Sequence, residues 1–255
     1  MSANPPMPVT PAMQAHPAHN PTASDASSTS RPWLAALAGK FIVFEGADGC
    51  GKSTQLSRFA KLCADAGLSV CQLREPGGTD VGERVRTILL DKNSAGMTVR
   101  CEMLLFMASR AQLVEQRIAP ALARGDLVLT DRFTASTYAY QGAGGGVPDA
   151  DIASVASVSC GTITPDLTLV FDLCEEAAAR RTGVATASKA QSGGSLFADR
   201  MEERDRDFFA KVRKGYLDLA RREPSRHTII DASGTPEQVW SLALTTLEAR
   251  FAKPS

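Results

Sequence analysis

The sequence predicts an α/β fold with a five-stranded parallel sheet that is covered by helices on both faces. Short apolar runs alternate with longer segments of helical periodicity from Lys40 to the end of the chain. The runs are continuously apolar, as expected for parallel strands that are buried on both faces. The first run leads straight into a glycine-rich loop and then a helix, which places a candidate ligand site at the carboxyl end of a strand.

Each element follows from its local pattern. Gly67 ends the first helix, Pro120 should kink or restart the longest one, and a flexible glycine segment over 142–146 separates two short helices. The apolar runs predict strands over 41–45, 69–73, 127–130, 167–171 and 228–230. The helical pattern covers 52–66, 80–90, a long segment from 98 past 114, then 134–140, 149–158, a segment from 175, 199–222 and 236–251.

The first part of the chain has a different composition from the rest. Residues 1–38 are rich in Pro, Ala, Ser, Thr and Asn and are expected to form a disordered tail. They lack the basic start and apolar stretch of a secretory signal. Trp33, Leu34 and Leu37 are candidates for docking the end of this tail onto a single domain, residues 39–255.

Charge and cysteine usage exclude several classes of protein. Lys plus Arg and Asp plus Glu both number 28, so the balance argues against bulk nucleic-acid or membrane-surface binding. No apolar run approaches the ~20 residues of a spanning helix. The six cysteines form no Cys-x-x-Cys pair and lie in apolar segments, which indicates reduced thiols and a cytoplasmic location.

Histidine is scarce. His16 and His19 lie in the tail, without a third metal ligand nearby, and only His227 belongs to the domain. Catalytic devices that pair Ser or Cys with His are therefore not expected.

The glycine-rich loop carries the main chemical signal. Gly46 and Gly51-Lys52-Ser53 fit the pattern G-x-x-x-x-G-K-[ST], whose backbone N–H groups cradle phosphates. Lys52 would reach the β- and γ-phosphates, and the Ser53 hydroxyl would ligate Mg²⁺. A chance glycine turn is the alternative, but the strand before and helix after favour a nucleoside triphosphate site. That ATP-binding loop comprises Gly46, Ala47, Asp48, Gly49, Cys50, Gly51, Lys52, Ser53 and Thr54.

Charged residues follow two other strands. Asp131 ends the third strand, where a Mg²⁺-binding carboxylate is expected, and Arg132 comes next. Arg74 takes the equivalent position after the second strand. Taken alone, each could be part of a salt bridge at a strand end. Together with Lys52 they predict several cations at one crevice.

Such a group of cations suits a kinase whose acceptor is itself a phosphate. Two unit charges about 4 Å apart repel by about 4 kcal/mol at an effective dielectric constant near 20, which cations must offset. A phosphate acceptor is already ionised, so it needs no general base, in agreement with the scarcity of histidine.

Phe106 and Arg110 share one helix face and could stack on a base and bind its carbonyl. Their spacing alone favours a core residue and a surface charge.

Taken together, these residues resemble the thymidylate kinase family, of the bacterial type with its catalytic arginine in a lid. The resemblance extends from Gly39 to about Phe251. It implies a P-loop NTPase fold like that of nucleoside monophosphate kinases, with ATP and dTMP as substrates, Mg²⁺ as cofactor, dTDP as product and a homodimer. Its markers are the motifs 44–49, 74–79 and 105–110, and Asp131-Arg132-Phe133 with the residues up to Gln141.

The resemblance also implies roles for single residues. Asp48 would bind the sugar 3′-hydroxyl, and Phe106 would stack on thymine with Arg110 at its carbonyl. Arg74 and Arg132 would hold the acceptor phosphate, and Tyr140 would exclude a 2′-hydroxyl. The base and sugar pocket would be lined by Ser136, Thr137, Tyr140 and Gln141.

The resemblance places a mobile lid at about 180–200. The phosphate loop has no arginine at positions 47–50, so the lid would supply the catalytic one. Arg181 and Arg200 are the first candidates and Arg180 the next. The lid's segment of small polar residues is longer and less basic than the family pattern.

Other functions remain open at this point. A deoxynucleoside kinase, or another nucleoside monophosphate kinase, would share the phosphate loop, and in the former Glu75 could accept the 5′-hydroxyl proton. A nucleotide-dependent switch is disfavoured, because the sequence contains no Asn-Lys-x-Asp for guanine.

Overall fold

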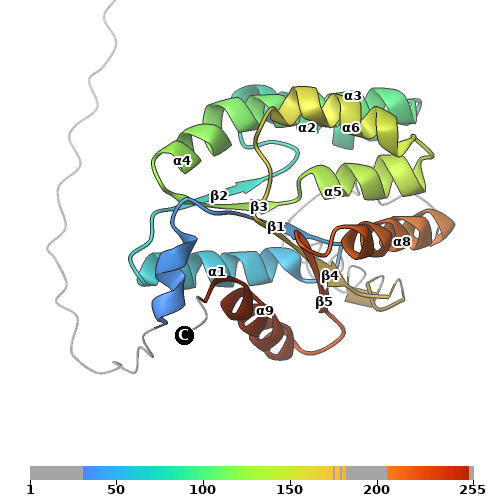
Figure 1. Cartoon of the computed structure of the whole chain (residues 1–255). Coiled ribbons are helices and arrows are strands. Elements are labelled where there is room, and N and C mark those ends of the chain that lie inside the picture. The colour runs from blue at the N-terminus through green and yellow to red at the C-terminus, as the bar shows by residue number, and fades with distance from the viewer. Residues whose placement is uncertain (1–30, 175, 179, 182–205, 253–255) are drawn as a thin grey trace, which may run out of the picture. The chain divides into compact units, whose positions relative to one another are not determined.

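The computed structural model describes residues 31–174, 176–178, 180–181 and 206–252. The described residues from Pro32 onward belong to one compact unit, which carries the fold. In that unit a five-stranded sheet lies between two layers of helices, as Figure 1 shows. The predicted fold class is therefore confirmed.

All five strands of the sheet are parallel, in the order β2-β3-β1-β4-β5. In the centre, Phe44 of β1 pairs with Asp131 of β3 on one side and with Leu169 of β4 on the other. The carboxyl ends of the three central strands therefore meet at one edge, where ligands bind in such sheets. The strands are β1 (Phe41–Glu45), β2 (Val70–Arg74), β3 (Leu127–Asp131), β4 (Leu167–Asp172) and β5 (His227–Asp231).

Side-chain caps start several of the helices. Thr79 and Thr98 accept hydrogen bonds from N–H groups three residues on, and Thr235 forms a capping box with Gln238. Among the described residues, no helix is both long enough and apolar enough to cross a membrane. The α-helices are α1 (Lys52–Asp65), α2 (Asp80–Leu90), α3 (Val99–Leu113), α4 (Ala119–Ala123), α5 (Thr134–Thr137), α6 (Asp149–Cys160), α8 (Arg206–Arg222) and α9 (Pro236–Phe251).

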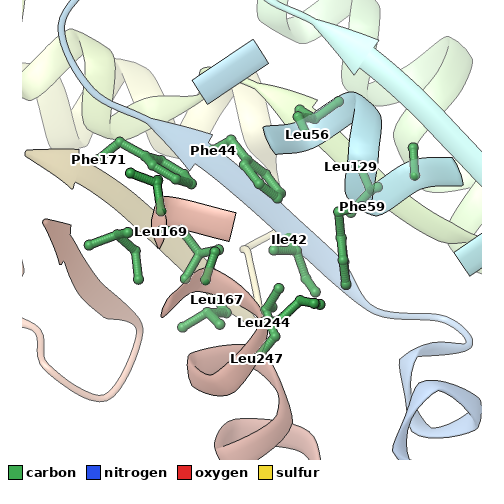
Figure 2. Packing of buried hydrophobic residues seen from close by; sticks show 14 of the residues in the cluster. Ile42, Phe44, Leu56, Phe59, Leu129, Leu167, Leu169, Phe171, Leu244 and Leu247 are labelled. Atoms are coloured by element: carbon green, nitrogen blue, oxygen red, sulfur yellow. The ribbon is translucent and has the colours of Figure 1, made fainter. Parts of the chain in front are cut away.

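One face of the sheet packs against α1 and α9. Phe44 of β1 stacks on Phe171 of β4 with ring centroids 5.6 Å apart, and Figure 2 shows the Phe44 ring between Phe171 and the α1 side chains Leu56 and Phe59. Leu244 and Leu247 of α9 close the same cluster. Alternate residues of each strand therefore bury one face, as the period of two requires.

The opposite face carries the other helices. Phe41 and Val43 of β1 pack against Leu113 of α3, and α4 adds Ala121. Val170 of β4 packs instead on α8. Burial on both faces explains why the strands are continuously apolar, as predicted.

The structure confirms one detail of the predicted elements and corrects another. The long helix restarts at Pro120, as predicted: it passes through a π-helical segment, η3 (Val114–Ile118), and α4 then begins at Ala119 with the proline in its first turn. The glycines expected to be a flexible break instead largely continue α5 as a second π-helix, η4 (Tyr138–Gly144). Close packing explains this, because a Cβ on Gly144 would lie 2.7 Å from the Phe208 ring of α8.

The domain begins earlier in the chain than residue 39. A 3₁₀-helix, η1 (Pro32–Leu37), buries Trp33, Leu34 and Leu37 in the cluster beneath α1 and α9. Trp33 stacks on Phe59 with ring centroids 6.5 Å apart. These three apolar side chains bind η1 to the domain, as their sequence suggested.

Replacing Leu37 by alanine should lower the free energy of unfolding by about 2–5 kcal/mol, because its side chain is fully buried. Leu242→Ala, at a position of α9 that is 42% exposed, is the matched control and should change it by less than about 0.5 kcal/mol. Urea titration followed by circular dichroism measures both. Equal stability of Leu37→Ala and the wild type would show that η1 does not contribute to the core.

Candidate active site

The glycine loop connects the carboxyl end of β1 to the amino end of the 14-residue helix α1. Gly46 has φ 138°, and a Cβ there would lie 2.5 Å from the carbonyl oxygen of Phe171. Gly51 caps α1 with φ 88°, in the left-handed region that glycine adopts without strain. The loop therefore brings its backbone N–H groups and a helix amino end to one point, an arrangement that binds phosphate.

Lys52 is the first residue of α1 and is largely buried between two carboxylates. Its Nζ lies 3.4 Å from Asp48 Oδ1 and 3.7 Å from Asp131 Oδ1. The Ser53 hydroxyl donates to Asp131 Oδ2 at 2.5 Å. Three predicted groups, an ammonium, a carboxylate and a hydroxyl, thus meet at the phosphate loop.

A cavity of about 120 Å³ adjoins this loop, large enough for a ligand rather than a single water molecule. Asp48 lines the cavity and also contacts Lys52, so the two sites are continuous. The predicted substrate residues other than Arg74 and Arg110 all contribute to its wall. The lining residues are Asp48, Glu75, Pro76, Arg86, Leu90, Phe106, Arg132, Ser136, Thr137, Tyr140 and Gln141.

Arg132 is the best-anchored cation of this cavity. Its Nη2 donates to Asp48 Oδ1 at 2.8 Å and to the Tyr140 hydroxyl at 3.2 Å. Its Nη1 donates to Ser136 Oγ at 3.1 Å and to the Tyr216 hydroxyl at 3.0 Å. The guanidinium also lies over the Tyr140 ring, 5.1 Å from the centroid. These contacts fix a positive charge next to the phosphate loop.

The charge states of two neighbours follow from this arrangement. Burial raises the pKa of Asp48, but Arg132 and Lys52 more than offset that effect and hold this pKa well below its usual range. Asp48 is therefore a carboxylate at neutral pH. Burial raises the pKa of Tyr140 despite the nearby Arg132, so its phenol remains protonated.

Arg110 lies behind the cavity wall. Its guanidinium is 1% exposed and donates to Glu75 Oε2 at 2.8 Å, to Thr137 Oγ1 at 3.1 Å and to the carbonyl oxygen of Phe133 at 3.0 Å. Burial raises the pKa of Glu75, an effect that Arg110 opposes. In this structure Arg110 thus supports residues of the wall, and its contact with a base stays a prediction.

The second predicted arginine outside the wall is Arg74. Its guanidinium is more than half exposed and donates to Glu83 Oε2 at 3.0 Å. Arg86 of α2, not Arg74, lines the cavity, and it donates to the carbonyl oxygen of Pro76 at 3.0 Å. Arg86 carried no sequence signal, because a lone arginine on an amphipathic helix does not reveal which face it occupies.

One wall of the cavity is formed by α3 and η4. Phe106 of α3 is half-buried in the wall, and Gln141 of η4 is held by a hydrogen bond from its Nε2 to Glu102 Oε1 at 2.8 Å. The two π-helical residues Tyr140 and Gln141 both face the cavity. This wall offers an aromatic surface and fixed polar groups, as recognition of a planar base requires.

The lid residues are only partly described. Arg181 donates to the carbonyl oxygens of Ala232 at 3.1 Å and Gly234 at 3.2 Å, in the loop between β5 and α9. Arg180 is exposed. Arg200 and most of the predicted lid lie outside the described residues. The catalytic roles assigned to these arginines stay predictions.

Comparison with known proteins agrees with this geometry. The thymidylate kinase family profile matches residues 44–242. The thymidylate kinase of Thermoanaerobacter sp. (strain X514) is 44% identical over 76% of this chain and 90% of its own. That of Pseudomonas syringae pv. syringae (strain B728a) is 44% identical over 83% and 96%. The chain belongs to the thymidylate kinase family.

A solved thymidylate kinase has the same fold. The crystal structure of the enzyme from Ehrlichia chaffeensis superposes with a TM-score of 0.64, at 29% identity, over 82% of this chain and 98% of that one. The resemblance predicted from the phosphate loop and the strand-end motifs is thereby confirmed.

The residues at the phosphate loop fit Mg²⁺, the cofactor that membership in the thymidylate kinase family implies. Within the described residues, no group of three His, Cys, Asp or Glu side chains could hold a metal ion. Mg²⁺ rarely uses such a cage and is held by one or two protein oxygens together with substrate phosphates. The adjacent oxygens of Ser53 and Asp131 are suitable ligands of this kind.

Two residues that contact Arg132 or the segment after it were not predicted from the sequence. Glu45, at the end of β1, is fully buried and bonded to the segment after Arg132. Its signal was an acidic residue at the end of an otherwise apolar run. Tyr216 of α8 reaches Arg132 from 84 positions further along the chain, and no local pattern indicates such a contact.

Proposed function

We propose that the protein transfers the γ-phosphoryl group of ATP to dTMP, giving dTDP and ADP, as a nucleoside monophosphate kinase of nucleotide biosynthesis. Family membership supports this activity. The observation that carries it is the cavity that adjoins Lys52 and contains Arg132, Asp48 and Tyr140. A second anion site next to a phosphate loop is what an acceptor phosphate needs.

Different residues of the site bind the phosphate donor, ATP, and the phosphate acceptor, dTMP. The loop N–H groups and Lys52 hold the β- and γ-phosphates of ATP, and Arg132 holds the phosphate of dTMP. Arg132 keeps its charge, and its Nε–H has no hydrogen-bond partner among the described residues. Both phosphates are thus held close together by fixed cations, which offsets their mutual repulsion.

The reaction then needs little further help from the protein. A phosphate oxygen of dTMP attacks the γ-phosphorus, and the bond from that phosphorus to the β–γ bridging oxygen breaks. The attacking oxygen is already ionised, so no general base is required. Mg²⁺, held by Ser53 and Asp131, supplies neutralising positive charge when it is bound. Arg181 and Arg200 of the lid are proposed to stabilise the charge that develops during transfer.

The acceptor side of the cavity is proposed to select deoxythymidine. Phe106 would stack on the base, and Tyr140, fixed under Arg132, would leave no room for a 2′-hydroxyl. Ser136, Thr137 and Gln141 complete the wall. A contact of Arg110 with the base carbonyl would require one of its N–H groups to turn from its present partner to the ligand.

One assay tests the activity and separates it from its nearest rival. Glu75 lines the cavity, and in a deoxynucleoside kinase it would accept the proton of a 5′-hydroxyl. The purified protein should phosphorylate dTMP with ATP and leave thymidine unchanged when product nucleotides are separated by ion-exchange chromatography. Phosphorylation of thymidine, with dTMP untouched, would refute the proposal.

Two properties of the protein as a whole are proposed with it. The surface formed by α3 and α6 exposes two large apolar side chains, Leu104 and Val158, and Val158 is 85% exposed. This surface is proposed to form the interface of a homodimer. Light scattering that gives the monomer mass at micromolar concentration would contradict the homodimer.

The free thiols of all six cysteines agree with a reducing, cytoplasmic location, which cell fractionation tests.

A further inference from the structure

Glu45 is a buried carboxylate with no assigned role. Its Oε1 accepts hydrogen bonds from the N–H groups of Phe133 at 2.8 Å and Ser136 at 3.1 Å. Its Oε2 accepts from the Ser136 hydroxyl at 2.7 Å and the Tyr216 hydroxyl at 2.9 Å. A buried charge is costly unless it is satisfied in this way, and all four donors belong to the surroundings of Arg132.

The backbone of Arg132 needs such support. Its φ is 75°, in the left-handed region that residues other than glycine seldom adopt. The Arg132 N–H donates to the carbonyl oxygen of Phe44 at 3.0 Å, and the next N–H donates to Glu45. The unusual turn that aims Arg132 at the cavity is therefore held by two consecutive residues of β1.

The guanidinium of Arg132 depends on Glu45 as well. The two hydroxyls that accept from Arg132 Nη1 are those of Ser136 and Tyr216, the same two that donate to Glu45 Oε2. A hydroxyl has a single proton, so one that donates to the carboxylate presents only lone pairs to the arginine. Burial and the charge of Glu45 raise the pKa of Tyr216, which keeps its hydroxyl protonated.

We propose that Glu45 is a positioning residue for the acceptor phosphate: it orients the Ser136 and Tyr216 hydroxyls so that both accept from Arg132 and hold the guanidinium beside Asp48. The inference rests on the proposed function, because it takes Arg132 to bind the acceptor. Glu45 itself touches no substrate. It acts on dTMP through Arg132 and has no direct contact with the ATP loop residue Lys52 among the described interactions.

The isosteric variant Glu45→Gln tests this inference sharply. The two backbone N–H groups require the amide oxygen at the Oε1 position, so the NH₂ group must face the hydroxyls. One of the two hydroxyls that accept from this NH₂ can donate to the other, 2.8 Å away, but the second then turns its proton toward Arg132 Nη1, where two donors oppose each other. We expect kcat/KM for dTMP to fall roughly 10- to 100-fold, with KM for ATP changed less than about twofold.

A matched pair of tyrosine variants provides an independent measurement. Tyr216→Phe removes one acceptor from Arg132 and should lower kcat/KM for dTMP by about 5-fold, with KM for ATP unchanged. Tyr138→Phe removes a partly buried hydroxyl outside the cavity and should match the wild type in both. If Glu45→Gln does not fold, Tyr216→Phe still tests the inference.

The outcomes separate positioning from general stability. Dissociation constants for dTMP and for a non-hydrolysable ATP analogue are measured by calorimetry, with thermal unfolding of each variant. Loss confined to dTMP supports the inference. Wild-type kinetics in Glu45→Gln or in Tyr216→Phe, or equal losses of dTMP and ATP-analogue affinity, would overturn it. A wild-type protein that does not phosphorylate dTMP would instead refute the proposed function.

Discussion

Replacing Arg132 by alanine is expected to lower kcat/KM for dTMP by about 10³-fold while the protein still binds ATP. The guanidinium is held by Asp48, Tyr140, Ser136 and Tyr216, so its charge is already in place before the acceptor arrives. Alanine removes both the charge and the planar donor group. The repulsion between donor and acceptor phosphates is then no longer offset on the acceptor side.

Steady-state kinetics with dTMP varied at saturating ATP measures this effect. Arg132→Lys should recover only part of the activity, because a single ammonium cannot serve the four acceptors that the guanidinium fork reaches. Arg124→Ala removes an arginine at the opposite end of β3 and should leave kcat/KM unchanged. Full turnover in Arg132→Ala would show that the acceptor phosphate binds elsewhere.

Replacing Lys52 by alanine is expected to reduce kcat by about 10²–10³-fold. Lys52 is largely buried and lies within 4 Å of carboxylates of both Asp48 and Asp131. Its removal leaves these two negative charges beside the loop that receives the triphosphate. The charge that would stabilise the transferring phosphoryl group is lost, and repulsion of ATP is added.

Single-turnover measurements with preformed complexes separate the chemical step from binding. Lys61→Ala is the matched control on the same helix, since this lysine is 75% exposed and its ion-pair partner among the described residues is Asp65. It should retain the wild-type rate. A loss of ATP affinity in Lys52→Ala without any change in the chemical rate would reassign Lys52 to binding alone.

Much of the fold could be predicted because its signals are local. The strand β1, the glycine loop and α1 follow one another along the chain, and the loop has a pattern that few other structures share. The helix Asp80–Leu90 was predicted with its observed bounds, because the turn residues 74–79 mark its start. The π-helical segments η3 and η4 had no such signal, since they arise where the helices pack against neighbours.

Some residues of the candidate site could also be predicted from local sequence signals, and others could not. Asp131 and Arg132 could be placed from sequence because they end a strand beside the phosphate loop, and parallel strands bring their carboxyl ends together. The sequence could not show that Arg86, rather than Arg74, lines the cavity. Arg74 forms an ion pair with Glu83, nine residues away, and only the packed position of α2 shows that Arg86 faces the cavity.

By itself, the sequence determined that this protein has a parallel α/β sheet, a phosphate loop with Lys52 and Ser53, and the motifs of a thymidylate kinase. These features depend on residues that lie close together in the chain, where spacing and backbone preference are sufficient. The tertiary structure alone decided how Arg132 is held. Glu45, Ser136 and Tyr216 come from β1, α5 and α8, and their hydrogen bonds exist only because packing of those three elements buries a carboxylate among their donors.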